Sequence, residues 1–126
     1  MIDHTGVNCS DFETSKRFYE KALAALGYEK LMEFGGDEGR AAGFGEKGKL
    51  DFWLGEGKAQ KPPVHIAFRA QDRKVVDAFY AAAIAAGGKD NGAPGPRPQY
   101  HENYYGAFVL DPDGHNIEAV CHAPSP

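Results

Sequence analysis

Residues 4–27, HTGVNCSDFETSKRFYEKALAALG, align without a gap on residues 65–88, HIAFRAQDRKVVDAFYAAAIAAGG. The alignment places His4 on His65, and Gly27 falls on Gly88. Two copies are too few for a solenoid, so the repeat indicates the duplication of one module. Each copy starts with a histidine, a residue able to bind metals, inside a predicted strand.

Each copy has the pattern of a strand followed by a helix. We expect the first strand to open at Ile2 and to run to Asn8, with His4 in its middle. The first helix is expected to start at Ser10, because Ser10 and Glu13 have the spacing of a capping box. In the second copy Asp72 is expected to cap the helix.

Three further strands are expected after each helix. In the first copy they are predicted at 28–35, 40–46 and 50–54. The second copy is predicted to have a first strand at 64–70, a short edge strand and a loop within 89–103, and strands at 104–110 and 115–122. The Asp111–Gly114 segment between the last two strands has the pattern of a type I turn.

The sequence therefore predicts an α+β fold of two βαβββ modules that form curved mixed sheets around a metal-binding cavity. We expect one domain over residues 1–126. It divides into a module at 1–55, a linker at 56–63 that contains Pro62-Pro63, and a module at 64–126.

Composition narrows the class of protein. The net charge is −4 and no basic patch is present, which argues against a nucleic-acid partner. No apolar run approaches the ~20 residues that cross a bilayer, so no membrane partner is expected. The chain enters a strand without a signal peptide, and Cys9 and Cys121 lie far apart. Reduced thiols and a cytoplasmic location are therefore expected.

Side chains alternate between the two faces of a strand. The apolar residues Val64, Ile66 and Phe68 should pack on the helix, and in the fourth strand Leu50 and Phe52 should do the same. The opposite, cavity-facing side then receives the polar or aromatic candidates His4, Asn8, Asp51, Trp53, His65, Arg69 and Glu118.

Two imidazoles, of His4 and His65, and the carboxylate of Glu118 are therefore expected on the same face. A single strand histidine is more often structural than a ligand, but the recurrence of His4 at His65, beside Glu118, favours a metal site. Such a donor set accepts a divalent Zn, Mn, Fe, Ni or Co ion and leaves coordination positions open. Matching Ile117 with Phe52 puts Trp53 where the second module has Glu118.

The remaining polar and aromatic residues have structural alternatives. His101, His115 and His122 are expected in loops or at the surface. A turn is a sufficient role for the aspartates of the Asp111–Gly114 segment. Trp53 is expected either to fill the core or to line the pocket.

Asp3-His4, the VHIA sequence at 64–67 and above all YYGAFVLDPDGHNIE at 104–118 resemble the vicinal oxygen chelate superfamily over essentially the whole chain. That superfamily contains glyoxalase I, extradiol dioxygenases, fosfomycin-inactivating thiol transferases and bleomycin-binding resistance proteins. The resemblance implies that His4, His65 and Glu118 are metal ligands. Glyoxalase I has a fourth ligand, a carboxylate, where this chain has Trp53, and this departure counts against a true glyoxalase I.

The resemblance also implies a homodimer in which His4 of one chain completes the site of the other. A metal-dependent enzyme on a small oxygenated substrate is the first hypothesis, of lyase or isomerase, thiol-transferase or dioxygenase type. The alternative is a non-catalytic, drug-sequestering protein. Tyr104, Tyr105 and His101 are the candidates for a catalytic base, although cross-strand packing also accounts for the tyrosines. Arg69 is a candidate for binding an anionic group. The metal, the substrate and the reaction stay open.

Overall fold

The two predicted βαβββ modules are present in a computed structural model that describes residues 1–125. The first consists of β1 (Thr5–Cys9), α1 (Phe12–Ala24), β2 (Glu29–Phe34), β3 (Ala41–Glu46) and β4 (Lys49–Glu56). The second consists of β5 (His65–Arg69), α2 (Arg73–Ala85), β6 (Lys89–Pro96), β7 (Tyr105–Leu110) and β8 (Asn116–Cys121). The α+β fold class predicted from the repeat is confirmed.

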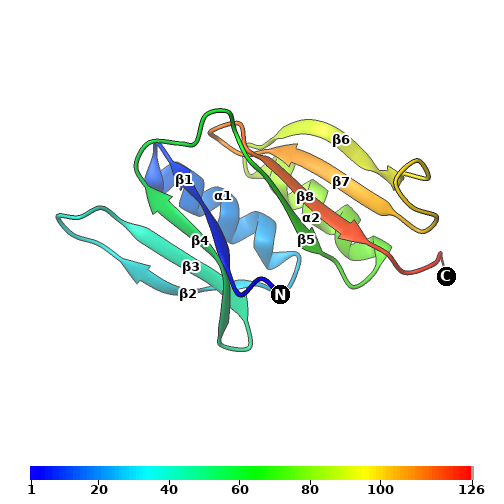
Figure 1. The fold of residues 1–126 in the computed structure, drawn as a ribbon, viewed down its shortest axis with the longest axis horizontal. Coiled ribbons are helices and arrows are strands. Elements are labelled where there is room, and N and C mark those ends of the chain that lie inside the picture. Colours follow the sequence, from blue (N-terminus) through cyan, green and yellow to red (C-terminus); the bar gives the residue numbers. More distant parts are fainter. Residues whose placement is uncertain (126) are drawn as a thin grey trace.

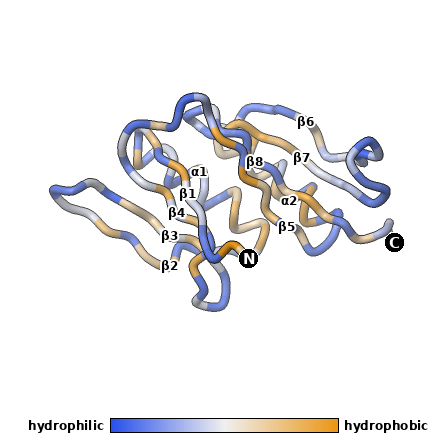
Figure 2. The backbone as a smooth tube through the Cα atoms, viewed as in Figure 1, coloured by the Kyte–Doolittle hydropathy of each residue, from blue (hydrophilic) through white to orange (hydrophobic). Residues whose placement is uncertain are grey.

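Each module forms one four-stranded mixed sheet, with the orders β1-β4-β3-β2 and β5-β8-β7-β6. The two sheets lie side by side with β1 and β5 toward the middle, and both helices lie behind them (Figure 1). The connection from β4 to β5 and the loop after β6 are hydrophilic (Figure 2). Because both helices lie on one side of the sheets, the opposite face of each sheet is left open (Figure 1).

One apolar core extends through both modules. Its buried residues come from both helices and from the helix-facing sides of both sheets. The Phe52 ring of β4 lies 5.3 Å from the Phe68 ring of β5, and Tyr28 also packs edge-on against Phe68. Because these contacts cross between the modules, neither sheet buries its apolar face alone. No helix in the described residues is long and apolar enough to cross a membrane.

The first helix begins differently from the prediction. Asp11, not Ser10, is the N-cap, and its carboxylate accepts from the Thr14 amide at 3.2 Å. Ser10 instead donates from its amide and its hydroxyl to the Asp113 carboxylate, at 3.1 and 2.5 Å. The predicted capping box is therefore wrong, because Ser10 bonds to Asp113, a residue distant in sequence. The predicted cap of α2 by Asp72 is confirmed, with the Val75 amide at 2.9 Å.

The first strand also starts later than predicted, at Thr5. Its pairing with β4 ends where Thr5 lies opposite Phe52, so His4 stands just outside the strand. The next residue of β4 in that direction, Asp51, belongs to an irregularity. Phe44 pairs with Phe52 while the adjacent Gly45 pairs with Leu50, which leaves Asp51 as the extra residue of a β-bulge.

The bulge exchanges the faces of two side chains. A Cβ atom on Gly43 would meet Leu50 at 2.6 Å and the Trp53 ring at 3.0 Å, so Leu50 and Trp53 cover the same face of the sheet. Asp51 turns instead to Tyr28, whose hydroxyl donates to it at 2.7 Å. The predicted packing of Leu50 on the helix, with Asp51 on the other face, is therefore wrong.

The β7–β8 turn has the predicted form, with the Gly114 amide donating to the Asp111 carbonyl and Gly114 at a φ of 88°. Its aspartate also reaches across the molecule. Asp111 accepts from the amides of Asp113 and His115, each at 2.9 Å, and from the Tyr19 hydroxyl of α1 at 2.5 Å. The turn thus fastens the second sheet to the first helix.

His115 is fully buried, so its predicted place at the surface is wrong. Its Nδ1 accepts from the Val64 amide and its Nε2 donates to the Asn8 carbonyl, both at 3.1 Å. The imidazole therefore joins the end of β1 to the start of β5. A buried histidine with both nitrogens bonded to the backbone is a structural group.

Candidate functional site

The open face of the second sheet carries a buried carboxylate. Glu118 of β8 is only 1% exposed, although it lies on the side away from α2. His65 of the neighbouring strand β5 donates from Nε2 to Glu118 Oε1 at 2.8 Å, and the Tyr104 hydroxyl donates to Oε2. Within residues 1–125 these two side chains are its only partners. The predicted convergence of His65 and Glu118 is thus present in the geometry.

Tyr104 and Tyr105 have opposite surroundings. Burial raises the pKa of the Tyr104 hydroxyl, and its hydrogen bond to Glu118 raises it further. Tyr104 therefore holds its proton at neutral pH and acts as a donor, which argues against a role as general base. Tyr105 points to α2, where its hydroxyl donates to Asp77 at 2.7 Å, so it does not belong to the Glu118 cluster.

An aromatic floor continues the cluster across the sheet. Phe108 of β7 pairs with Glu118, and its ring centroid lies 6.3 Å from that of His65. The guanidinium carbon of Arg97 lies 5.5 Å from the same ring. Arg97 stands at the end of the β6–β7 hairpin, where its amide donates to the Tyr104 carbonyl at 2.8 Å. Arg97 is not among the residues predicted for the site, because its Pro- and Gly-rich surroundings have no strand or helix periodicity.

His4 lies outside this cluster in the single chain. Its side chain is 57% exposed, and its Nδ1 donates to Asp3 Oδ1 at 2.7 Å. This hydrogen bond with His4, together with the nearby charge of Lys49, lowers the pKa of Asp3. A carboxylate on Nδ1 fixes the tautomer in which Nε2 is free to bind a metal, which is the usual arrangement of metal-binding histidines. Among residues 1–125 of one chain, no group of three or more His, Cys, Asp or Glu side chains could hold a metal ion.

The open face of the first sheet is apolar. Trp53 stacks on Phe34 with ring centroids 6.0 Å apart and an angle of 11°, and Met32 lies on the same strand as Phe34. Phe34 is 51% exposed. Gly6 pairs with Trp53 as Ala67 pairs with Glu118, so the predicted correspondence between Trp53 and Glu118 is confirmed. The first module thus presents an aromatic surface where the second presents a carboxylate.

The other predicted pocket residues lie along β1 and the module junction. Asn8 places its side-chain oxygen near Gly55, beside Trp53 on the strand pair. Asp51 and Arg69 line one cavity of about 510 Å³ between β1 and β5, together with Tyr28. Within residues 1–125 neither residue has a hydrogen bond or ion pair to His65 or Glu118. Ala67, which pairs with Glu118, also lines this cavity.

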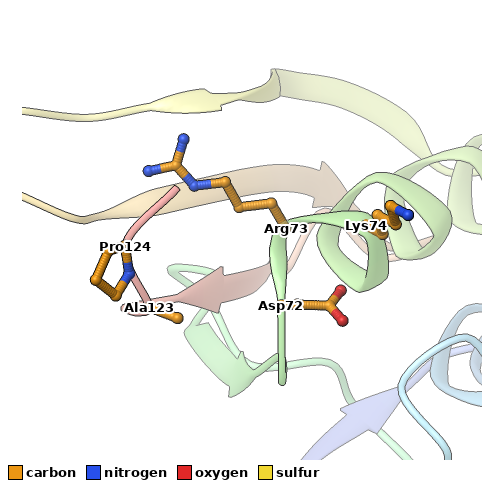
Figure 3. Close-up of a pocket in the computed structure, with 5 residues that line it drawn as sticks. All are labelled: Asp72, Arg73, Lys74, Ala123 and Pro124. Carbon is orange, nitrogen blue, oxygen red and sulfur yellow. The ribbon is translucent and has the colours of Figure 1, made fainter. Parts of the chain in front are cut away.

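His101 and His122 lie at the exposed end of the second sheet, as expected for loop or surface residues. Their rings meet edge-on at 5.2 Å, and His122 also contacts Tyr104. His101 therefore reaches Glu118 only through the rings of His122 and Tyr104. A further cavity of about 300 Å³ lies on the helix side at the start of α2, where Arg73 extends toward Pro124 and the Asp72 carboxylate points away (Figure 3). None of the predicted site residues lines it.

Comparison with known families accounts for the repeated geometry. The sequence profile described as the Glyoxalase/Bleomycin resistance protein/Dioxygenase superfamily matches residues 1–119. The chain belongs to this superfamily, the vicinal oxygen chelate superfamily. The resemblance seen in the Asp3-His4 and 104–118 motifs is thereby confirmed. No curated protein matches the chain.

Solved structures of the vicinal oxygen chelate superfamily share the fold. A glyoxalase/bleomycin resistance protein from Albidiferax ferrireducens is 28% identical with a TM-score of 0.77, and the match covers 98% of this chain and 99% of that one. A glyoxalase-related enzyme from Fulvimarina pelagi is 18% identical with a TM-score of 0.71, over 96% and 87% of the two chains. A variant of glyoxalase I from Zea mays is 18% identical with a TM-score of 0.71 over 98% of this chain but only 45% of that one.

Proposed function

We propose that the protein is a metal-dependent enzyme of the vicinal oxygen chelate superfamily that acts on a small oxygenated substrate. The observation that carries this proposal is the Glu118 cluster on an open sheet face. A carboxylate buried without a lysine or arginine partner is costly, unless hydrogen bonds and a cation compensate it. A divalent ion is the cation that suits imidazole and carboxylate donors.

The residues present fit such an ion as part of a site. Glu118 and His65 supply two convergent donor atoms, and Tyr104 holds the second carboxylate oxygen from behind. His4 is the third ligand of the proposed set, contributed by a second copy of the chain, since it does not join the cluster within one chain. When bound, the metal supplies Lewis-acid stabilisation to two neighbouring oxygens of the substrate.

A homodimer supplies the missing half of the site. Its support is the exposed, tautomer-fixed His4 and the exposed Phe34 and Met32 on the same open face as Trp53. In the proposed dimer the aromatic surface of one chain covers the Glu118 cluster of the other. The covered site excludes water, and its aromatic wall orients the substrate.

A binding protein without turnover is the second candidate. It is favoured by Trp53, which gives the first module an aromatic surface in place of a fourth ligand. Such a surface suits the sequestration of a planar molecule. The two candidates differ in whether the metal-loaded protein turns a substrate over.

The test starts with the metal content of the purified protein and with zinc and manganese titrations. His4→Ala, His65→Ala and Glu118→Ala should each weaken metal binding by at least about tenfold while leaving the circular dichroism spectrum unchanged. Glu20→Ala, which removes an exposed carboxylate from α1, should bind metal as the wild type does. Wild-type affinity in all three variants would contradict the assignment.

The metal-loaded protein is then screened against dicarbonyls, epoxides with thiols, and catechols. Metal-dependent turnover of one class identifies the enzyme. Tight binding without turnover in every class would favour the sequestering candidate.

A further inference from the structure

Arg97 is held in a fixed position beside the Glu118 cluster. Its Nη1 donates to the Gly95 carbonyl at 2.9 Å and its Nη2 donates to the Ala93 carbonyl at 2.8 Å. A longer contact of 3.4 Å joins Nη1 to the Pro96 carbonyl. These bonds fold the side chain back over Phe108, so the charge is placed without further loss of rotamer freedom.

The charge of Arg97 has no counter-ion in the protein. Within residues 1–125 Arg97 makes no ion pair. Nη1 has two carbonyl acceptors and Nη2 has one, so in the described part of the chain Nε–H and one N–H of Nη2 have no protein acceptor. A guanidinium with two free N–H groups matches the two oxygens of a carboxylate.

Arg97 and the cluster belong to one site. The amide of Arg97 bonds to the Tyr104 carbonyl, and the hydroxyl of Tyr104 bonds to Glu118. The Phe108 ring centroid lies 5.5 Å from the Arg97 guanidinium carbon and 6.3 Å from the His65 ring centroid. A divalent ion on two imidazoles and one carboxylate keeps a net positive charge, to which Arg97 adds another.

We propose that Arg97 binds a carboxylate of the substrate, so that the substrate is a small anionic molecule with two neighbouring oxygens and a separate carboxylate. This inference rests on the proposed metal-dependent function. Arg97 takes this role in place of Arg69, because Arg97 lies over Phe108 and its amide bonds to Tyr104. Within residues 1–125 no hydrogen bond or ion pair joins Arg69 to His65 or Glu118.

The test compares two probes that differ by one carboxylate, catechol and protocatechuate. Their dissociation constants are measured by Trp53 fluorescence and by calorimetry on the zinc-loaded full-length protein. The wild type should bind protocatechuate about tenfold more tightly than catechol. Arg97→Gln should reduce this preference to about twofold or less, with the affinity for catechol unchanged.

Two variants separate charge from structure. Arg97→Lys keeps the charge and should keep part of the preference. Arg17→Gln removes the same charge from the exposed face of α1 and should keep the full preference for protocatechuate. If Arg97 only supports its loop, Arg97→Gln weakens both probes by the same factor, and that result overturns the proposal.

The outcomes also separate this inference from the proposed function. Zinc-dependent binding without a preference for protocatechuate would overturn the role of Arg97 alone. A preference lost in Arg97→Gln, with binding that does not change on metal removal by EDTA, would overturn the metal-dependent function alone. Failure of both probes to bind at millimolar concentration would contradict both.

Discussion

The smallest unit of the proposed site is the hydrogen bond from Tyr104 to Glu118. Two adjacent tyrosines differ in role because strand side chains alternate: Tyr104 turns to the open face and Tyr105 to α2. In the proposed site Tyr104 is therefore a positioning residue, which orients the Glu118 carboxylate for the metal. The neighbouring tyrosine offers a matched control on the opposite face.

Tyr104→Phe should weaken metal affinity by about tenfold, because the loss of one hydrogen bond to a charged group leaves Glu118 Oε2 unpaired. The measurement is a competition titration against a fluorescent chelator. Tyr105→Phe should leave metal affinity unchanged and should cost only stability. Equal metal affinities in the two variants would contradict the positioning role.

A second prediction at this scale concerns Cys9, which is buried and free. Burial raises the pKa of its thiol to about 11, and the charge of Asp113 adds to this rise. Because the folded pKa lies above the unfolded value of 9.0, the stabilisation is complete below about pH 9 and is lost as the pH rises toward 11. The free energy of unfolding, measured by urea titration, should fall over this pH interval. Cys9→Ala should reduce this fall by on the order of 2 kcal/mol. If the unfolding free energies of the wild type and Cys9→Ala fell equally between pH 9 and 11, the role of the Cys9 thiol would be contradicted.

At the scale of elements, the bulge in β4 decides which side chains reach the open face. It requires a close approach at Gly45, where a Cβ atom would lie 1.7 Å from the Lys49 carbonyl oxygen. Gly45→Ala should therefore destabilise the fold by more than about 2 kcal/mol in denaturant unfolding. Gly35→Ala, whose new Cβ would have 4.0 Å to its nearest neighbour, should stay within about 0.5 kcal/mol. If Gly45→Ala were as stable as Gly35→Ala, the bulge would not be a constraint.

Strand periodicity was sufficient to predict the order of elements and the meeting of His65 with Glu118. It could not predict the bulge, because no residue pattern marks Asp51 as the extra residue of β4. The start of α1 was missed because Ser10 and Asp11 are both good caps, and a distant partner, Asp113, decides between them. Arg97 could not be predicted as a site residue, because only the fold shows that this loop residue lies beside Phe108 and Tyr104.

At the scale of the whole molecule, His115 joins the two modules. General exposure of histidines predicted a surface position, whereas this ring is buried between Val64 and Asn8. His115→Ala should cost about 2–4 kcal/mol of unfolding free energy, since it leaves a cavity and two unpaired backbone groups. His122→Ala, at an exposed position, should cost less than about 0.5 kcal/mol. Similar losses in the two variants would argue against a structural role for the buried ring.

The metal site is proposed to form between two chains, because one chain brings together only His65 and Glu118, while His4 lies apart. Two inactive variants test it directly: His4→Ala chains and Glu118→Ala chains are mixed, unfolded and refolded together. Shared sites predict that each mixed dimer regains one intact site, so metal binding should return to about a quarter of the wild-type level under random pairing. Metal binding that stays at the level of the separate variants, or a monomer in sedimentation at micromolar concentration, would contradict a metal site shared between two chains.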